Sequence, residues 1–205
     1  MLSSLNLESV FATAIAEHLS LINELERQRQ RLEQIASRMT QALLAGNKIL
    51  WCGNGGSAAD AQHLAGEFMG RFRRDRPALA SIALTENAAA VIGIANDYGF
   101  QQIFTRQVEA LCQQGDVFVG ISTSGNSRNV SVAAARAKQM GAYVVALTGE
   151  HGGKLGSAAD SWIRIPSHET ARIQEAYMLC GHMLCDWVEL ATCITHATLV
   201  RRHAG

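Results

Sequence analysis

The sequence has little of what marks several large classes of protein. It contains two prolines in 205 residues and no low-complexity linker, so nothing in it divides the chain into separate domains. Lys plus Arg and Asp plus Glu are balanced at 18 each, which leaves no basic excess for direct nucleic-acid binding. No apolar run approaches the roughly 20 residues that a membrane helix requires. We therefore expect a single domain over residues 1–205, with one core and no membrane partner.

Signals for disulfides and for export are also missing. The five cysteines are an odd number, include no CxxC pair and stand mostly among apolar residues. This pattern favours buried, reduced thiols over a disulfide framework. The chain begins without the basic segment and the apolar core of a signal peptide. Together these features predict a cytoplasmic protein.

The N-terminal segment, residues 1–46, is predicted to be helical. Apolar residues between positions 5 and 45 recur at spacings of three, four or seven, but His18 and Gln28 interrupt this stripe. One long helix and two helices with a break therefore both remain open, with a stop at Gly46-Asn47. Such an amphipathic segment packs either on its own chain or on another subunit, and the sequence favours neither.

Short apolar strands then alternate with helices over residues 47–192. The predicted strands are 48–51, 80–84, 116–122, 142–147 and 161–165. The predicted helices are 57–71, 87–95, 100–113, 127–140 and 170–191, with a turn at 96–99 and a tail at 193–205. Continuous apolar strands separated by helices indicate a parallel sheet that is covered on both faces. We expect a three-layer α/β/α sandwich whose ligands bind at the carboxyl edge of the strands.

A glycine-rich turn follows the first strand and opens a helix. Its sequence, Gly53-Asn54-Gly55-Gly56, lacks the later glycine of the GxGxxG dinucleotide motif. The helix after it places His63 and Glu67 four residues apart on one face. An imidazole and a carboxylate at this spacing suit a divalent metal or acid–base catalysis, although such a pair is more often a hydrogen-bonded surface pair.

A second turn, Ser122 to Ser127, is rich in hydroxyl groups. It reads Ser-Thr-Ser-Gly-Asn-Ser, follows a buried strand and opens a helix whose first N–H groups are free. Hydroxyls and a helix N-terminus together favour an anion site over simple helix capping. The turn has no lysine and does not match the GxxxxGK[ST] motif. This pattern favours a sugar phosphate over a nucleoside triphosphate.

The last helix carries Gln174 and His182. They are eight residues apart and lie within about 80° of each other around the helix axis, at about 100° per residue. A long glutamine side chain can close that gap. Whether this helix meets the helix of His63 is not determined by spacing.

Five segments in this order resemble the sugar isomerase (SIS) domain family: CGNGGSAADAQH, NDYGF, ISTSGNS, LTGEHGGK, and ARIQE followed by His182. They span about residues 40–190 and are most similar to the branch that isomerises sedoheptulose 7-phosphate. The resemblance implies a flavodoxin-like sheet of five parallel strands. It also implies a homotetramer with shared active sites and one zinc ion per subunit.

The resemblance also implies roles for individual residues. The substrate contacts it implies are Asn54, Gly55, Gly56, Glu67, Asn96, Asp97, Ser122, Thr123, Ser124, Ser127 and Gln174. The zinc ligands it implies are His63, Glu67, Gln174 and His182. Glu67 is expected to act as the base and His182 as its partner acid or base, with zinc polarising the carbonyl. A side chain held tightly by zinc is a poor proton carrier, so the role of the metal stays open.

The implied activity converts D-sedoheptulose 7-phosphate to D-glycero-D-manno-heptose 7-phosphate through an enediol. This reaction is the first step towards activated heptose for lipopolysaccharide or another surface polysaccharide. The alternative is a second branch of the family, adaptors that bind the replication initiator DnaA without catalysis. That branch lacks the catalytic Glu and the last-helix His and carries Thr in place of the second glycine, whereas this chain has Gly56, Glu67 and His182.

Two features depart from the isomerase pattern or stand outside it. Tyr177 occupies a position where many isomerases have His, which changes the polarity expected of the pocket. The basic run from Arg71 to Arg76 is interpreted as a solvated surface turn, with Arg71 as the member most able to reach a substrate.

Overall fold

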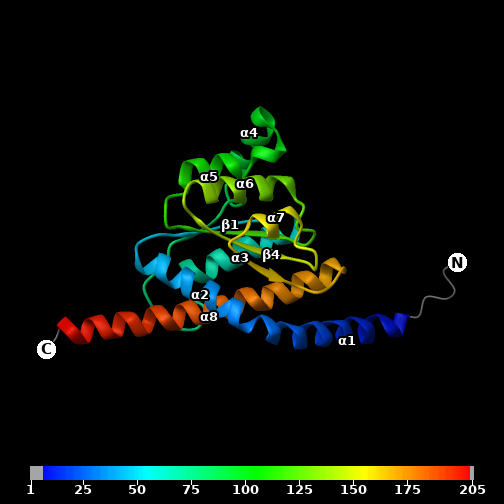
Figure 1. The fold of residues 1–205 in the computed structure, drawn as a ribbon, viewed down its shortest axis with the longest axis horizontal. Helices are drawn as coiled ribbons and strands as arrows, with labels where there is room; N and C mark the ends of the chain where they lie inside the picture. Colours follow the sequence, from blue (N-terminus) through cyan, green and yellow to red (C-terminus); the bar gives the residue numbers. More distant parts are fainter. Residues whose placement is uncertain (1–6, 204–205) are drawn as a thin grey trace.

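Five parallel strands form the central sheet of the computed structural model, which describes residues 7–203 (Figure 1). The order across the sheet is β2-β1-β3-β4-β5, which is the flavodoxin-like order. The predicted three-layer α/β/α fold with five parallel strands is therefore confirmed. The strands are β1 (Ile49–Cys52), β2 (Ser81–Ala83), β3 (Val117–Ser122), β4 (Tyr143–Thr148) and β5 (Ser161–Arg164).

Helices cover both faces of this sheet. The first half of the chain contributes α1 (Leu7–Leu25), the 3-10 turn η1 (Glu26–Gln28), α2 (Arg29–Leu44), α3 (Gly56–Met69) and α4 (Ala88–Tyr98). The second half contributes the 3-10 turn η2 (Phe100–Gln102), α5 (Thr105–Leu111), α6 (Arg128–Gln139), α7 (Gly153–Ala158) and α8 (Thr170–His203). Within residues 7–203, no helix combines the length and the apolar character needed to cross a bilayer.

The period of two along each strand divides the apolar side chains between two cores. In β1, Ile49 and Trp51 pack with α2, α3 and α8, while Leu50 and Cys52 pack with α5, α6 and α7. Every residue of β1 and β3 is buried, because helices cover both faces of a parallel sheet. This explains why these strands appear in the sequence as continuous apolar runs.

Several predicted boundaries were wrong. The predicted helix 100–113 is divided into η2 and α5, whereas the break at η1 makes the N-terminal segment two helices, one of the two alternatives that the sequence left open. Asn96 and Asp97 lie in the last turns of α4 rather than in a turn, because the helix ends only at Gly99, where φ is +88°. The helix α7 was not predicted, and α8 continues past Ala191 to His203 through most of the predicted tail. Residues 1–6 and 204–205 lie outside the described part of the chain.

Candidate functional site

The hydroxyl-rich turn after β3 gathers its side chains around a common point. Ser122 is buried, and its Oγ lies 3.0 Å from Ser127 Oγ and 3.5 Å from Ser124 Oγ. Ser127 is the N-cap residue of α6, yet its side chain makes no capping hydrogen bond to the helix. The hydroxyls thus lie beside the free N–H groups of α6, which suits an anion better than simple capping does.

The loop between β4 and α7 supports this turn from one side. Gly149 N donates to Thr123 O at 3.0 Å, and Leu155 N donates to Gly125 O at 2.9 Å. Gly125 has a φ of +65°, and a Cβ at this position would lie 2.0 Å from Gly152 O. Only glycine fits here, so the turn is held in one shape by its neighbours.

The glycine-rich turn after β1 is joined to the same region by a pair of amides. Asn54 Nδ2 donates to Asn129 Oδ1 at 2.9 Å, and Asn129 Nδ2 donates to Asn54 Oδ1 at 2.8 Å. Asn129 is buried in the first turn of α6. The nitrogen and the oxygen of the Asn54 side-chain amide are thus both engaged, and this side chain ties the glycine-rich turn to the first turn of α6.

Gly56, the first residue of α3, lies against Gln174 of α8. A Cβ at Gly56 would lie 2.5 Å from Gln174 Nε2 and 2.7 Å from Gln174 Oε1. Any side chain at position 56 must therefore displace the end of Gln174. Gly56, which the family resemblance implies as a substrate contact, is therefore also needed for the close spacing of α3 and α8.

The imidazoles of α3 and α8 meet, which the sequence spacing could not determine. His63 Nε2 lies 2.9 Å from His182 Nε2, and it lies 3.6 Å from Glu67 Oε1. The side chain of His63 is about half exposed (48%), whereas that of Glu67 is 23% exposed. Phe72 stacks on the His182 ring, with ring centroids 5.5 Å apart and planes at 23°. Glu67 and His182 thus contact the same imidazole in a partly shielded position.

Gln174, the fourth implied zinc ligand, is engaged elsewhere. Its Nε2 donates to Asp60 Oδ2 at 2.7 Å. Burial raises the pKa of Asp60, and hydrogen bonds from Gln174 and Tyr177 and the charge of His63 offset part of that rise. Asp60 was not predicted as a site residue, although it lies one helical turn before His63 on the same face of α3.

Tyr177 is buried rather than presented to a ligand. Its hydroxyl lies 2.7 Å from Ser57 Oγ, and burial raises the pKa of the phenol above its ordinary value. Tyr177 therefore stays protonated near neutral pH and is unsuited to carry a proton there. It forms part of the wall between α8 and the start of α3.

Asn96 and Asp97 are not brought to the other predicted residues of the same chain. Asn96 Nδ2 donates to Asp97 Oδ1 at 2.8 Å, and both side chains are exposed. Over residues 7–203, neither has a hydrogen bond or an ion pair to the rest of the predicted site. Figure 1 places α4 at one extreme of the molecule, on the other side of the sheet from α8.

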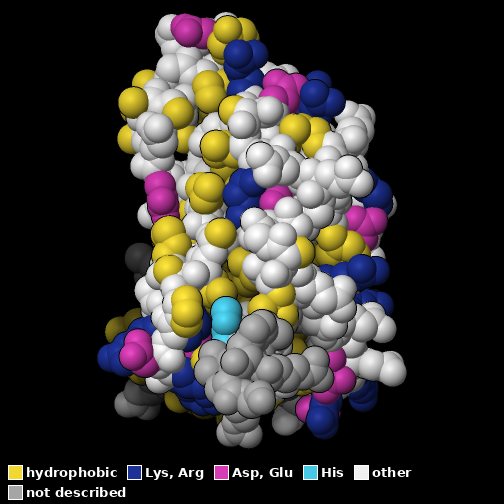
Figure 2. Space-filling view, turned by 90° about the vertical axis from the view of Figure 1, so that its left-hand side faces the viewer, with side chains coloured by type: hydrophobic (Ala, Val, Ile, Leu, Met, Phe, Trp, Pro, Cys, Tyr) yellow, Lys and Arg dark blue, Asp and Glu magenta, His cyan; other side chains and the backbone are white. Residues whose placement is uncertain are grey.

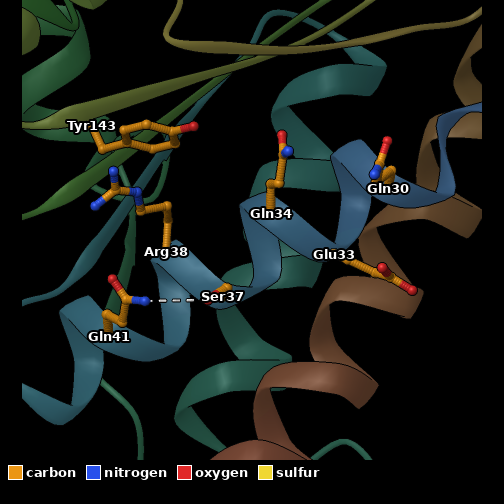
Figure 3. A pocket seen from close by; sticks show the side chains of 7 residues that line it. All are labelled: Gln30, Glu33, Gln34, Ser37, Arg38, Gln41 and Tyr143. Carbon is orange, nitrogen blue, oxygen red and sulfur yellow. Dashed lines mark hydrogen bonds between the residues drawn. The ribbon is translucent and has the colours of Figure 1, made fainter.

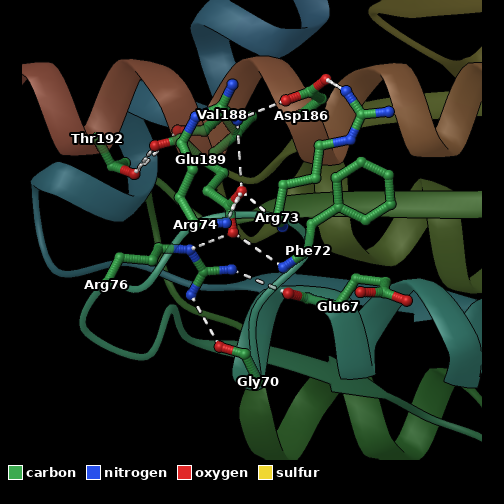
Figure 4. Close-up of polar contacts among 10 residues, drawn as sticks. All are labelled: Glu67, Gly70, Phe72, Arg73, Arg74, Arg76, Asp186, Val188, Glu189 and Thr192. Atoms are coloured by element: carbon green, nitrogen blue, oxygen red, sulfur yellow. Dashed lines mark hydrogen bonds and ion pairs between the residues drawn. The ribbon is translucent and has the colours of Figure 1, made fainter.

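A buried carboxylate holds the segment that carries Phe72. Glu189 of α8 accepts backbone N–H bonds from residues 72, 73 and 74, each at 2.9 Å (Figure 4). Arg76 Nε lies 3.3 Å from Glu189 Oε1, with both side chains almost fully buried. The guanidinium of Arg76 also donates to Glu67 O and Phe68 O at 2.9 Å, which closes the C-terminal turn of α3.

The expectation of a solvated turn at residues 71–76 was therefore partly wrong. Arg71 and Arg73 are exposed, but Arg76 is inside, and Arg74 pairs with Asp186 at 2.5 Å. The reason is the buried carboxylate of Glu189, which needs donors and a positive charge. A glutamate within the apolar stripe of α8 was the available sequence signal.

A hollow on the outer face of α2 is less suited to chemistry (Figure 3). Arg38 lies over the Tyr143 ring at 5.3 Å, and Gln41 Nε2 donates to Ser37 Oγ at 3.2 Å. The hollow is lined by one acid, one arginine, one tyrosine, one serine and three glutamines, with no His or Cys. We assign no reaction to it.

Comparison with known proteins identifies the family to which the chain belongs. The family model of the SIS domain matches residues 11–149. The chain belongs to the SIS domain family. Within that family it falls in the phosphoheptose isomerase branch. The phosphoheptose isomerase of Helicobacter hepaticus is 46% identical over 183 residues, 89% of this chain and 93% of that protein. That of Aneurinibacillus thermoaerophilus is 50% identical over 160 residues, 78% and 81% of the two chains.

Solved structures of the branch share the fold. The phosphoheptose isomerase of Neisseria gonorrhoeae superposes with a TM-score of 0.85 at 44% identity, covering 90% of this chain and 99% of that one. The enzyme of Francisella tularensis gives 0.82 at 38% identity, covering 89% and 96%. The fold is therefore shared over about nine tenths of this chain.

The Glu189 contacts generate a prediction for stability. Burial alone raises the pKa of Glu189, but the three N–H donors and Arg76 outweigh it, and the net pKa lies below the ordinary 4.5. Its stabilising contribution is therefore complete above pH 4.5 and is lost as the pH falls through the lower folded value. At pH 7, Glu189→Gln should lower the free energy of unfolding by about 3–5 kcal/mol in urea denaturation, because Arg76 loses its buried partner.

The control for this prediction is Glu109→Gln, which removes a carboxylate from an exposed pair with Arg136 at 3.1 Å. That change should cost at most about 1 kcal/mol. The loss from Glu189→Gln should also shrink at acid pH, where the wild-type carboxylate is protonated. Equal losses for the two variants, or a loss independent of pH, would contradict the assignment.

Proposed function

We propose that the protein is an aldose–ketose isomerase that converts D-sedoheptulose 7-phosphate to D-glycero-D-manno-heptose 7-phosphate. The observation that carries the proposal is the contact between α3 and α8, which places Glu67 and His182 around one imidazole, His63. Membership of the phosphoheptose isomerase branch supports the choice of substrate. The product is a precursor of activated heptose for lipopolysaccharide or another surface polysaccharide.

The reaction requires a proton to move from C1 to C2 of the sugar through an enediol. Glu67 takes the proton from C1, and His182 serves the oxygens and C2, since a partly shielded carboxylate and imidazole suit general acid–base catalysis. The phosphate binds at Ser122–Ser127, where hydroxyls and the free N–H groups of α6 meet. Asn54 holds the turn at the reacting end against α6.

The donor set on α3 and α8 fits zinc in type, although its three ligand atoms do not all lie within 4.8 Å of one another. Two imidazole nitrogens 2.9 Å apart and a carboxylate oxygen 3.6 Å from one of them are ligands that zinc prefers. We propose that His63, Glu67 and His182 hold one zinc ion per subunit, joined by Gln174 once it leaves Asp60. When bound, the metal supplies Lewis-acid polarisation of the sugar carbonyl.

The adaptor alternative is disfavoured by Gly56 as well as by Glu67 and His182. A threonine at position 56, as in the adaptor branch, is incompatible with the observed position of Gln174, because even a Cβ would lie 2.5 Å from it. A glycine at this position suits a chain that uses Gln174 in a binding site.

We also propose a cytoplasmic homotetramer with shared active sites. Support comes from large apolar side chains left exposed on α1, including Phe11 at 77% and Ile15 at 61%. A groove of about 340 Å³ between α2 and α8 is lined by Leu32, Met183 and Trp187 among others. In the space-filling view of Figure 2, apolar side chains are also exposed at the top of the molecule, where α4 lies. Asn96 and Asp97 on α4 would then serve the site of a neighbouring subunit.

The proposed cytoplasmic location is supported by the cysteines. All five are free thiols, as expected in the cytoplasm.

Replacing the proposed base tests the reaction. Glu67→Gln should lower kcat for sedoheptulose 7-phosphate by about 10²–10⁴-fold, because general acid–base catalysis contributes about that factor. Binding of the sugar phosphate, measured by calorimetry, should change only a few-fold. Glu109→Gln is the matched control and should retain full turnover. Retained activity in Glu67→Gln would remove Glu67 from the catalytic role.

Replacing Gly56 tests whether its spacing matters for the site. Gly56→Ala should displace Gln174, which is the end of a flexible side chain, so the melting temperature should change little. The value of kcat/KM should fall about 10²-fold, as expected for a displacement of about 1 Å near the reacting groups. Gly66→Ala, where a Cβ meets nothing within 4 Å, is the control. Equal activity of the two variants would show that Gln174 does not act in the site.

A further inference from the structure

We propose that Glu150, His151 and His168 form a second divalent-cation site, separate from the residues on α3 and α8. Their ligand atoms all lie within 4.8 Å of one another, the one such group of three His, Cys, Asp or Glu side chains in residues 7–203. His168 Nε2 lies 3.0 Å from Glu150 Oε2, and the rings of His151 and His168 have centroids 5.2 Å apart. None of the three is among the implied zinc ligands.

Two loops of fixed shape bring these side chains together. The loop after β4 carries Glu150 and His151 and is turned by Gly152, where φ is +66° and a Cβ would strike the Trp162 ring at 2.4 Å. The loop after β5 carries His168 and is closed by the bond from Ser167 N to Ile165 O at 2.8 Å. The cluster thus lies at the same carboxyl edge of the sheet as the hydroxyl-rich turn Ser122–Ser127, here called the phosphate turn.

The chemistry of the donors selects the class of metal. Two imidazoles and one carboxylate form the set found in open zinc sites, and they suit zinc, cobalt or nickel better than magnesium or calcium. Tetrahedral coordination with bonds of about 2.1 Å needs ligand atoms about 3.4 Å apart. His151 and His168 are exposed, so small rotations of their side chains can close the present separation.

A plain ion pair accounts for only part of the cluster. His168 pairs with Glu150 Oε2, and Arg164 Nη2 lies 3.5 Å from Glu150 Oε1. His151 joins neither pair and, in residues 7–203, has no side-chain hydrogen bond, although it lies against the second imidazole. A cation shared by the three side chains would give His151 a partner beside the His168 ring.

The open side of the cluster faces the phosphate turn. Glu150, His151 and His168 line one hollow of about 260 Å³ together with Thr123 and Ser124. A cation with three protein ligands keeps a position for a fourth, which an oxygen of a phosphate can fill. This role as a phosphate anchor rests on the proposed function, whereas the cation site itself does not.

Zinc stoichiometry in the full-length protein tests the site. Metal-free protein is titrated with Zn²⁺ by calorimetry and with Co²⁺ by visible absorption. Wild type and the control His196→Asn, which changes an exposed histidine of α8, should each bind two equivalents per chain. The double variants His151→Asn/His168→Asn and His63→Asn/His182→Asn should each bind one. Far-UV circular dichroism verifies that each variant is folded.

The outcomes separate this site from the proposed isomerase zinc. If His151→Asn/His168→Asn binds as many equivalents as wild type with the same Kd, the proposal is overturned. If wild type binds one equivalent that only this double variant loses, the proposal stands and the zinc site on α3 and α8 fails. If wild type binds one equivalent that only His63→Asn/His182→Asn loses, the zinc site on α3 and α8 stands and the site at Glu150, His151 and His168 is overturned.

Inorganic phosphate tests the anchoring role. Zn²⁺ should tighten phosphate binding at least tenfold in wild type and in His63→Asn/His182→Asn. It should have no effect in His151→Asn/His168→Asn. A phosphate Kd that is the same with and without Zn²⁺ in wild type would overturn the anchoring role, whatever the isomerase assay gives.

Discussion

The buried carboxylate of Glu189 is the contact on which the geometry between α3 and α8 depends. It takes three backbone N–H groups from residues 72–74 and lies beside the buried guanidinium of Arg76, which in turn closes the end of α3. A charge inside the protein needs partners, and the three N–H donors and Arg76 supply them for Glu189. The helix ends fixed in this way bring His63 to His182 and place Phe72 against the His182 ring.

The sheet supplies the second constraint. In the order β2-β1-β3-β4-β5, the chain turns outward in opposite directions after β1 and β3, and ligands bind in the crevice that opens between such loops. The amide pair of Asn54 and Asn129 crosses that crevice and joins the glycine turn to α6. The glycine turn after β1 and the start of α6 are therefore joined at one edge of the sheet, while α8 adds the His182 imidazole from outside the sheet.

The sequence allowed the strands, the layer order and both turns to be predicted, because burial on two faces produces apolar runs and turns require glycine and hydroxyls. Contacts between distant segments were not predictable from spacing: only the family resemblance, which implies His63 and His182 as ligands of one zinc ion, anticipated that the two imidazoles meet. Asp60 and Glu189 were missed because their importance comes from partners more than 100 positions away. Asn96 and Asp97 were expected near the site, yet within one chain α4 keeps them apart from it. The helix α7 was missed because its six residues, with two glycines at its start and middle, carry no apolar period.

Charge balance connects the phosphate turn with the loops beside it. Ser122–Ser127 has no lysine or arginine, so its attraction for an anion comes from neutral hydroxyls and from a helix end worth about half a positive charge. A phosphate near pH 7 carries about −1.5 to −2 charges. The remaining positive charge must come from outside the turn, and His151 and His168 line the same hollow as Thr123 and Ser124. A cation held by Glu150, His151 and His168 would supply that charge beside the turn. In a chain with no net charge, the proposed phosphate site would therefore draw its charge from this edge of the sheet rather than from an overall basic surface.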